Sequence, residues 1–109
     1  MNQFTGAETN RAALPLLDSE VLRTFVTIAE SGSFTRAAQQ LFRTPSALSM
    51  QIKRLEEILG QNLFVREARQ VRLTAEGEVL LGYSRRLLKL NAEAVTQFLA
   101  PALEGRVGL

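Results

Sequence analysis

The stretch that decides the fold runs from Ser33 to Gly60 and reads SFTRAAQQLFRTPSALSMQIKRLEEILG. Ser33 is a suitable N-cap for a short helix, and Thr44 followed by Pro45 is a suitable start for a second one. Residues 42–44 alone separate the two helices, and Gly60 can take the left-handed conformation that ends a helix. A short helix, a tight turn and a longer helix form the helix-turn-helix arrangement.

Successive residues of a helix are 100° apart, which gives the predicted helix over 45–59 two different faces. Its apolar face consists of Leu48, Ile52, Leu55 and Leu59. The opposite face carries Ser46, Ser49, Met50, Lys53 and Glu57. Short hydroxyl side chains can approach base edges or phosphates closely, and Lys53 is placed for a phosphate. Gln51 lies to the side of this face, which favours a structural hydrogen bond over a base contact.

The segment before this motif predicts one more helix. Asp18 or Ser19 is its N-cap, and Gly32 ends it after Ser31. Its apolar stripe recurs at helical spacing and consists of Val21, Leu22, Phe25, Val26 and Ala29. Residues 1–16 show no sustained period, so we expect a flexible N-terminal arm there.

Downstream of the motif the pattern changes to two short strands and a long helix. Residues 63–65 and 71–73 predict the strands of a hairpin whose connection, 66–70, is cationic. Thr74 is the expected N-cap of a helix over 75–100, which would be about 39 Å long at 1.5 Å per residue.

The predicted helix over 75–100 is longer than a domain of this size needs. Its apolar stripe consists of Leu81, Leu88 and Val95, and Phe98 would add apolar area near its end. This stripe could pack back on the first three helices, but the length of the helix favours a dimer interface. Residues 101–109 contain Pro101 and Gly105, and we expect them to form a hinge and the first strand of a further domain.

The composition excludes several classes of protein. The chain has 109 residues, of which 46% are hydrophobic and 22% charged, as expected of one folded domain. It contains no Cys and no His, which removes the usual zinc ligands, thiol nucleophiles and the commonest general base. No apolar run approaches the roughly 20 residues of a membrane span. We expect a cytoplasmic binding module that uses no cofactor and no metal.

The distribution of charge is more informative than the formal net charge of +2. Between Arg43 and Arg72 there are six basic and three acidic residues. Such an excess is usually only a solvated surface. In the predicted hairpin, however, Arg66 and Arg69 lie three residues apart, which suits a wing that follows a nucleic-acid backbone or enters the minor groove.

A family resemblance runs through most of the chain. The residues that carry it are Leu22 to Phe25, Gly32 to Phe34, Ala37, Ala38, Leu41, Thr44 to Glu56, Gly60, Leu63, Phe64, Arg66, Arg69, Leu73, Thr74 and Gly77. Their order and spacing, without a gap, resemble the DNA-binding domain of LysR-type transcriptional regulators. The resemblance covers residues 17–77 and continues through the predicted long helix.

The resemblance implies both a fold and a function. The fold would be mainly α, a winged helix-turn-helix over 17–74 with the helix-turn-helix at about 34–53, followed by a linker helix over 75–100 that forms a homodimer. The protein would regulate transcription by binding an inverted repeat in double-stranded DNA. A separate C-terminal domain would bind a small-molecule effector, and formation of a tetramer is left open.

The predicted DNA-contacting residues lie at the starts of the two motif helices, along the second helix and in the hairpin. They are Thr35, Arg36, Thr44, Pro45, Ser46, Ser49, Met50, Lys53, Arg54, Arg66 and Arg69. Pro45 stands where the resembled family commonly has Gln, and Met50 where it often has Arg. The target sequence therefore does not follow from the resemblance.

These assignments have alternatives. Thr44 and Pro45 could serve only to start a helix, and Arg54 could pair with an acidic residue of another turn. A different class of function is a protein-interaction module built on a winged helix, which predicts no salt-dependent affinity for duplex DNA. An enzyme is disfavoured because Tyr83 and the carboxylates form no convincing catalytic set.

Overall fold

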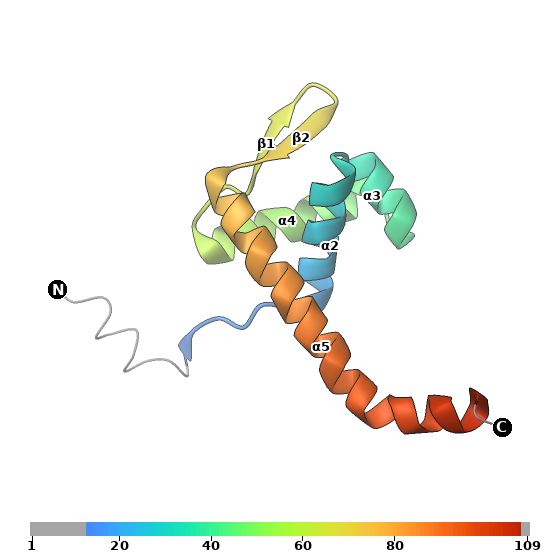
Figure 1. The fold of residues 1–109 in the computed structure, drawn as a ribbon. Coiled ribbons are helices and arrows are strands. Elements are labelled where there is room, and N and C mark those ends of the chain that lie inside the picture. Colours follow the sequence, from blue (N-terminus) through green and yellow to red (C-terminus); the bar gives the residue numbers. More distant parts are fainter. Residues whose placement is uncertain (1–12, 108–109) are drawn as a thin grey trace.

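Residues 13–107 are described by a computed structural model, in which three helices are followed by a hairpin and one long helix (Figure 1). The elements in chain order are α2 (Ser19–Ser31), α3 (Phe34–Leu41), α4 (Pro45–Leu59), β1 (Phe64–Glu67), β2 (Gln70–Leu73) and α5 (Ala75–Val107). This order confirms the predicted mainly α architecture. The expected arm over 1–16 lies largely outside the described residues, and 15–18 lead into α2 without regular structure.

The helices start at capping residues that the sequence predicts. At each start a side-chain oxygen accepts a hydrogen bond from a backbone N–H of the first turn. The pairs are Asp18 with Glu20 (2.8 Å), Ser33 with Arg36 (3.1 Å), Thr44 with Ala47 (3.1 Å) and Thr74 with Gly77 (2.9 Å). Gly32 and Gly60 end α2 and α4, each with φ of 70°. The predicted bounds of α4 are confirmed.

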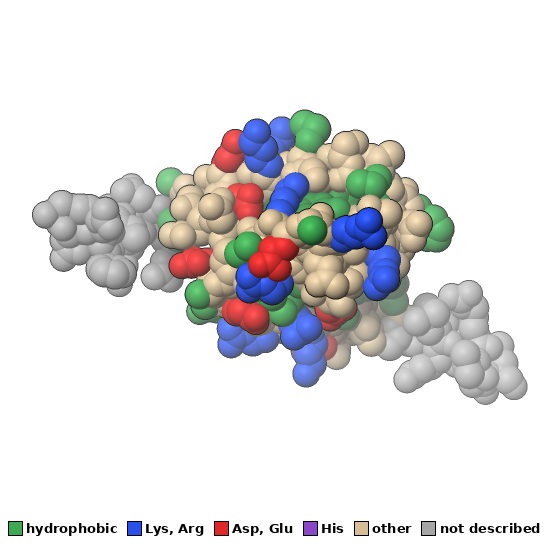
Figure 2. Space-filling view, turned by 90° about the horizontal axis from the view of Figure 1, so that it is seen from above, with side chains coloured by type: hydrophobic (Ala, Val, Ile, Leu, Met, Phe, Trp, Pro, Cys, Tyr) green, Lys and Arg blue, Asp and Glu red, His purple; other side chains and the backbone are tan. Residues whose placement is uncertain are grey.

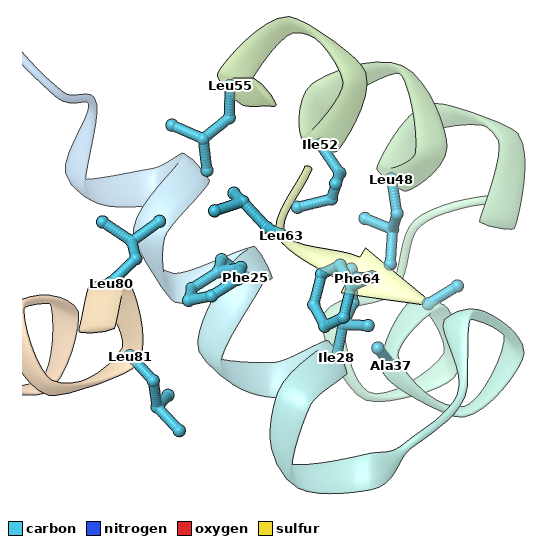
Figure 3. Close-up of a cluster of buried hydrophobic side chains, with 11 residues drawn as sticks. Phe25, Ile28, Ala37, Leu48, Ile52, Leu55, Leu63, Phe64, Leu80 and Leu81 are labelled. Carbon is cyan, nitrogen blue, oxygen red and sulfur yellow. The ribbon is translucent and has the colours of Figure 1, made fainter. Parts of the chain in front are cut away.

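A hydrophobic core joins the helices to the hairpin (Figure 3). The predicted apolar face of α4 points into it, with Leu48, Ile52 and Leu55 at most 3% exposed. Phe25 and Ile28 of α2 lie opposite and are fully buried. Burying one such side chain contributes about 1.5–3 kcal/mol, so this contact fixes the rotation of α4 about its own axis. The polar face of α4 is thereby turned outward.

The hairpin is longer than the sequence predicts. β1 and β2 are antiparallel, with Phe64 opposite Leu73 and Arg66 opposite Val71. The pairing continues past the predicted strand ends and leaves 68–69 as the connection. Because side chains alternate between the two faces of a strand, these four residues share the inner face of the hairpin. The three apolar ones pack against the core.

The first turns of α5 pack along α2, and this contact bears on the predicted dimer interface. Leu80, Leu81 and Ser84 are buried there. The sequence places Leu81 on a partner-facing stripe, but Leu81 is 9% exposed and belongs to the core. Leu88, one heptad further, is half-buried on the same side of the helix. The predicted stripe therefore begins inside the domain.

A different stripe of α5 is exposed. We call it the α5 stripe, and it consists of Tyr83, Leu87, Leu90 and Phe98. Each of these side chains is at least 46% exposed. At 100° per residue they lie within about 80° of one another, and Leu81 is about 160° away from Tyr83. Of the residues predicted for a dimer interface, Val95 (45%) and Phe98 (83%) are exposed, and Phe98 also lies on the α5 stripe.

The long helix also continues beyond its predicted end. It spans 33 residues and passes through Pro101 to reach Val107. A proline inside a helix removes one hydrogen bond and bends the axis without always ending the helix. Figure 1 shows the C-terminal part of α5 turning away from its first part. The predicted hinge over 101–109 is therefore helical as far as Val107, and 108–109 lie outside the described residues.

Within residues 13–107, none of the helices is both long and apolar enough to cross a membrane.

Candidate nucleic-acid interface

The outward face of α4 carries the side chains that the sequence predicts for it. Ser46, Met50 and Lys53 are exposed, and Ser49 is half-buried. At the start of the helix, the Thr44 hydroxyl accepts the Ala47 N–H and lies 3.4 Å from the Ser46 hydroxyl oxygen. The capping role of Thr44 therefore leaves its hydroxyl proton available to a further acceptor.

A cleft of about 530 Å³ separates α4 from β1. It is lined by Ser49, Met50, Lys53, Glu56, Asn62, Phe64 and Arg66. The Glu56 carboxylate is already used there, because its Oε2 accepts the backbone N–H of Leu63 at 2.8 Å. The cleft thus places two cations, Lys53 and Arg66, beside a hydroxyl and an amide. Sequence reasoning missed Asn62, whose place depends on how the loop after α4 folds back.

A second hollow, of about 350 Å³, lies between the start of α3 and the end of the hairpin. Arg36 and Arg69 both line it, together with Ser33 and Gln70. Thr35, the residue before Arg36, is exposed. One predicted residue from the start of α3, Arg36, and one from the hairpin, Arg69, therefore meet at one place.

Arg54 lies apart from these two sites. It lines a groove of about 400 Å³ together with Leu17, Val21 and Ile58, on the side of α4 that faces the segment before α2. Met50 borders both this groove and the cleft. The structure therefore brings Ser49, Lys53 and Arg66 together, but not Arg54 with them.

Arg72 differs from the other two arginines of the hairpin because it forms an ion pair. Among the side chains that the structure describes, the ion pairs join Arg23 to Glu20, Arg72 to Glu67 and Arg85 to Glu30. Arg72 donates two hydrogen bonds to Glu67, of 3.2 and 2.7 Å. These hydrogen bonds and the charge of Arg72 hold the pKa of Glu67 below its ordinary value, and Glu67 in turn raises the pKa of Arg72. Arg66 and Arg69 have no acidic partner within this set.

The surface around the hairpin carries both signs of charge. Figure 2, which looks onto the hairpin side, shows acidic side chains interspersed among the Lys and Arg side chains. The formal net charge of the chain is only +2, so its overall attraction for an anionic partner is weak. Individually placed cations, such as Lys53 and Arg66 of the cleft, would therefore contribute most of that attraction.

The folded region matches a known family. The model of the bacterial regulatory helix-turn-helix proteins of the lysR family matches residues 19–78. The HTH-type transcriptional regulator PecT of Dickeya dadantii (strain 3937) is 41% identical over 97 residues, which are 89% of this chain and 30% of that protein. DgdR of Burkholderia cepacia, also an HTH-type transcriptional regulator, is 45% identical over 91 residues, 84% of this chain and 31% of that protein.

Solved structures agree with this match. The DNA-binding domain of BenM, in complex with benA site 1 DNA, is 37% identical with a TM-score of 0.74, over 79% of this chain and 97% of that one. The DNA-binding domain of CbnR, also solved with DNA, is 31% identical with a TM-score of 0.74, over 79% of this chain and 99% of that one. The chain therefore belongs to the lysR family of bacterial regulatory helix-turn-helix proteins.

Proposed function

We propose that residues 17–74 bind duplex DNA, with α4 in the major groove and the hairpin on the backbone or in the minor groove. The cleft between α4 and β1 carries this proposal. Lys53 and Arg66 both line this cleft, and neither forms an ion pair with a described acidic side chain. Ser49 adds a hydroxyl to the same cleft. The DNA complexes of the similar BenM and CbnR domains give independent support.

Within this interface we assign two roles. Ser46, Ser49 and Met50 face outward from α4 and would read base edges, each good contact contributing about 1–3 kcal/mol of discrimination. Lys53 and Arg66 would hold phosphates and position α4. The remaining predicted contacts, which we place on the backbone flanking the major groove, are Thr35, Arg36, Thr44, Pro45 and Arg69. Arg54 lies on another side of α4, so among the predicted residues it is the least well placed to contact DNA.

A dimer follows from the α5 stripe. The 33-residue helix extends beyond the body of the domain and exposes Tyr83, Leu87, Leu90 and Phe98 to solvent. A second copy of the chain would cover these apolar side chains. Two domains related by a two-fold axis would then read an inverted repeat, whose half-site spacing depends on the dimer geometry.

The whole protein would be a transcription regulator. The chain spans 30% and 31% of the length of PecT and DgdR. In such a longer protein, residues 75–100 would be the linker between this domain and an effector-binding domain. A regulator that binds chromosomal DNA would act in the cytoplasm.

The test is a titration of fluorescent duplexes with the 109-residue chain at several salt concentrations, combined with selection of sites from a random pool. We expect the logarithm of the binding constant to fall linearly with the logarithm of the salt concentration, by about 0.9 for each phosphate contacted. The selected sites should contain an inverted repeat.

Two results would contradict the proposal. A chain without salt-dependent affinity for any duplex would favour the protein-interaction module instead. A selection without sequence enrichment would leave backbone binding but remove base readout by α4. As a control, Arg23→Ala should bind duplexes as the parent chain does, because Arg23 is an exposed arginine of α2 that pairs with Glu20, away from the cleft.

A further inference from the structure

Arg66 of the hairpin lies on the face of an aromatic ring. Its Cζ atom is 4.5 Å from the ring centroid of Phe34, the first residue of α3. A guanidinium over an aromatic face is attracted by the negative potential of the ring. Its N–H groups lie in the plane of the guanidinium, so stacking leaves donors available at the edges.

The Phe34 ring is itself held by the core. It meets Phe64 edge-on, with 5.9 Å between ring centroids and 68° between planes. The ring centroid of Phe64 in turn lies 5.3 Å from that of Phe25, which is fully buried. Figure 3 shows Phe25 and Phe64 side by side in the core. The position of Arg66 is thus fixed through three rings to the centre of the domain.

The register of the hairpin explains why Arg66 reaches this ring. Arg66 lies opposite Val71 and shares the inner face with Phe64, so its side chain points toward the helices. The backbone N–H of Val71 donates to the carbonyl of Gly32 at 3.2 Å. Gly32 is two residues before Phe34. The main-chain hydrogen bond of Val71 and the side chain of Arg66 therefore both attach the hairpin to the start of α3.

The other cations of the hairpin are in different environments. Arg69 is in the connection, beside Arg36. Arg72 is on the outer face and is paired with Glu67. Arg66 alone among these three both stacks on an aromatic ring of the described chain and lines the cleft with Ser49 and Lys53.

We propose that Phe34 is a positioning residue for DNA binding, which holds the Arg66 guanidinium at the edge of the cleft before DNA arrives. The inference rests on the proposed DNA-binding function and names a residue that contacts no DNA in this scheme. An arginine side chain loses conformational freedom when it is fixed on a partner. If the ring has already restricted it, less freedom is lost at the moment of binding, and the affinity is higher.

The test is a double-mutant cycle with Phe34→Leu and Arg66→Ala, measured on the selected duplex and on a random duplex at one salt concentration. Leu keeps apolar contact with Phe64 but presents no ring face. We expect Phe34→Leu to weaken binding about two- to fivefold in the parent chain and to have no further effect beside Arg66→Ala. Phe34→Tyr, which keeps the ring, should bind as the parent does.

A DNA-free measurement accompanies the cycle. In the free chain, NMR should show the Cδ protons of Arg66 shifted upfield by the ring current, and Phe34→Leu should remove this shift. In the Arg69→Ala background, Phe34→Leu should keep its full effect, because Arg69 is not on the ring. Circular dichroism checks that each variant keeps the helical content of the parent.

The outcomes separate the two proposals. Equal weakening by Phe34→Leu with and without Arg66 would mean that Phe34 acts through the fold of α3, which overturns the positioning role and leaves DNA binding intact. Unchanged affinity in Phe34→Leu would overturn it as well. A parent chain that binds no duplex at low salt would overturn the proposed function, and the positioning role with it.

Discussion

α4 and α5 each bury one side in the same core, but their outer sides differ in chemistry. The outer side of α4 exposes Ser46 and presents Ser49 and Lys53 to the cleft. The outer side of α5 presents Tyr83, Leu87, Leu90 and Phe98, which make the α5 stripe. Hydroxyls and a cation lose hydration when an apolar surface covers them, whereas exposed apolar side chains gain from being covered.

The comparison indicates two partners of different classes on one small domain. The face of α4 suits an anionic, hydrogen-bonding partner such as DNA. The α5 stripe suits a second copy of the chain. We expect the largest effects from substitutions that distinguish the buried side of α5 from the α5 stripe. We expect the smallest effect from the loss of a single ion pair in the hairpin.

Leu81→Glu should have the largest effect, because it places a carboxylate in the core beside α2. An unpaired buried charge costs several kcal/mol, which is a large part of the stability of a small domain. We expect about 3 kcal/mol or more of destabilisation, seen by circular dichroism in urea. A Leu81→Glu chain that folds normally and is monomeric would place Leu81 in a dimer interface, as its spacing in the sequence suggests.

Leu90→Glu tests the α5 stripe. The side chain is 63% exposed, so the variant should fold with the helical content of the parent. In a dimer the change affects both copies, and losing two buried leucines costs about 3 kcal/mol or more, a roughly 100-fold or larger rise in the dissociation constant. Sedimentation measures this directly. Lys89→Glu is the matched control, because Lys89 is an exposed neighbour that lies off the stripe; equal loss of dimer in both variants would point to charge rather than to the stripe.

Gly77→Ala tests the packing of the first turn of α5 against Leu63 and against Leu73 of β2. A Cβ atom at Gly77 would meet the Leu63 carbonyl oxygen and would lie 2.8 Å from a methyl carbon of Leu73. We expect about 1–3 kcal/mol of destabilisation from this overpacking. Gly82→Ala is the control, because nothing lies within 4 Å of its Cβ position, and it should stabilise α5 by about 0.5–1 kcal/mol. Thermal unfolding that ranks the two variants in the opposite order would contradict this packing.

Lys53→Ala tests the outer side of α4. Loss of one phosphate contact should weaken binding to all duplexes and reduce the slope of log K against log salt by roughly 0.9. Lys89→Ala removes an equal charge from α5 and should leave the slope unchanged. Identical slopes for Lys53→Ala and the parent would move the DNA backbone away from the cleft.

Local signals in the sequence predicted most of the fold. Caps such as Thr44 and stops such as Gly60 act through neighbouring residues, so the bounds of α4 could be predicted without knowing the rest of the chain. α5 was harder to predict, because two apolar stripes run along one helix. Which of Leu81 and Tyr83 is buried depends on how α5 docks on α2, and residues distant in the sequence determine that contact.

The candidate site was predictable in its residue types but not in its groupings. Spacing in α4 indicated Ser49 and Lys53, but the register of the hairpin decides that Arg66 meets them and that Arg72 is paired.

Two features of the structure had no local signal in the sequence. Phe42 takes a positive φ of 56° at the end of α3, where glycine or asparagine is usual. Gln51 has a buried side-chain oxygen without a partner among the described residues, so the predicted structural hydrogen bond is not made by that atom.

Glu67→Gln should have the smallest effect, on the ion pair with Arg72. The hydrogen bonds and charge of Arg72 hold the pKa of Glu67 below its ordinary value of 4.5, so the pair stabilises the fold above that value and this contribution is lost as pH falls through the lowered pKa. Both side chains are more than half exposed, so Glu67→Gln should flatten the acid side of the stability profile slightly. Arg72 would then be free to approach a phosphate, and the salt slope for a random duplex should steepen by at most about 0.9. Weaker binding by Glu67→Gln would show instead that the pair holds the hairpin in the conformation that DNA requires.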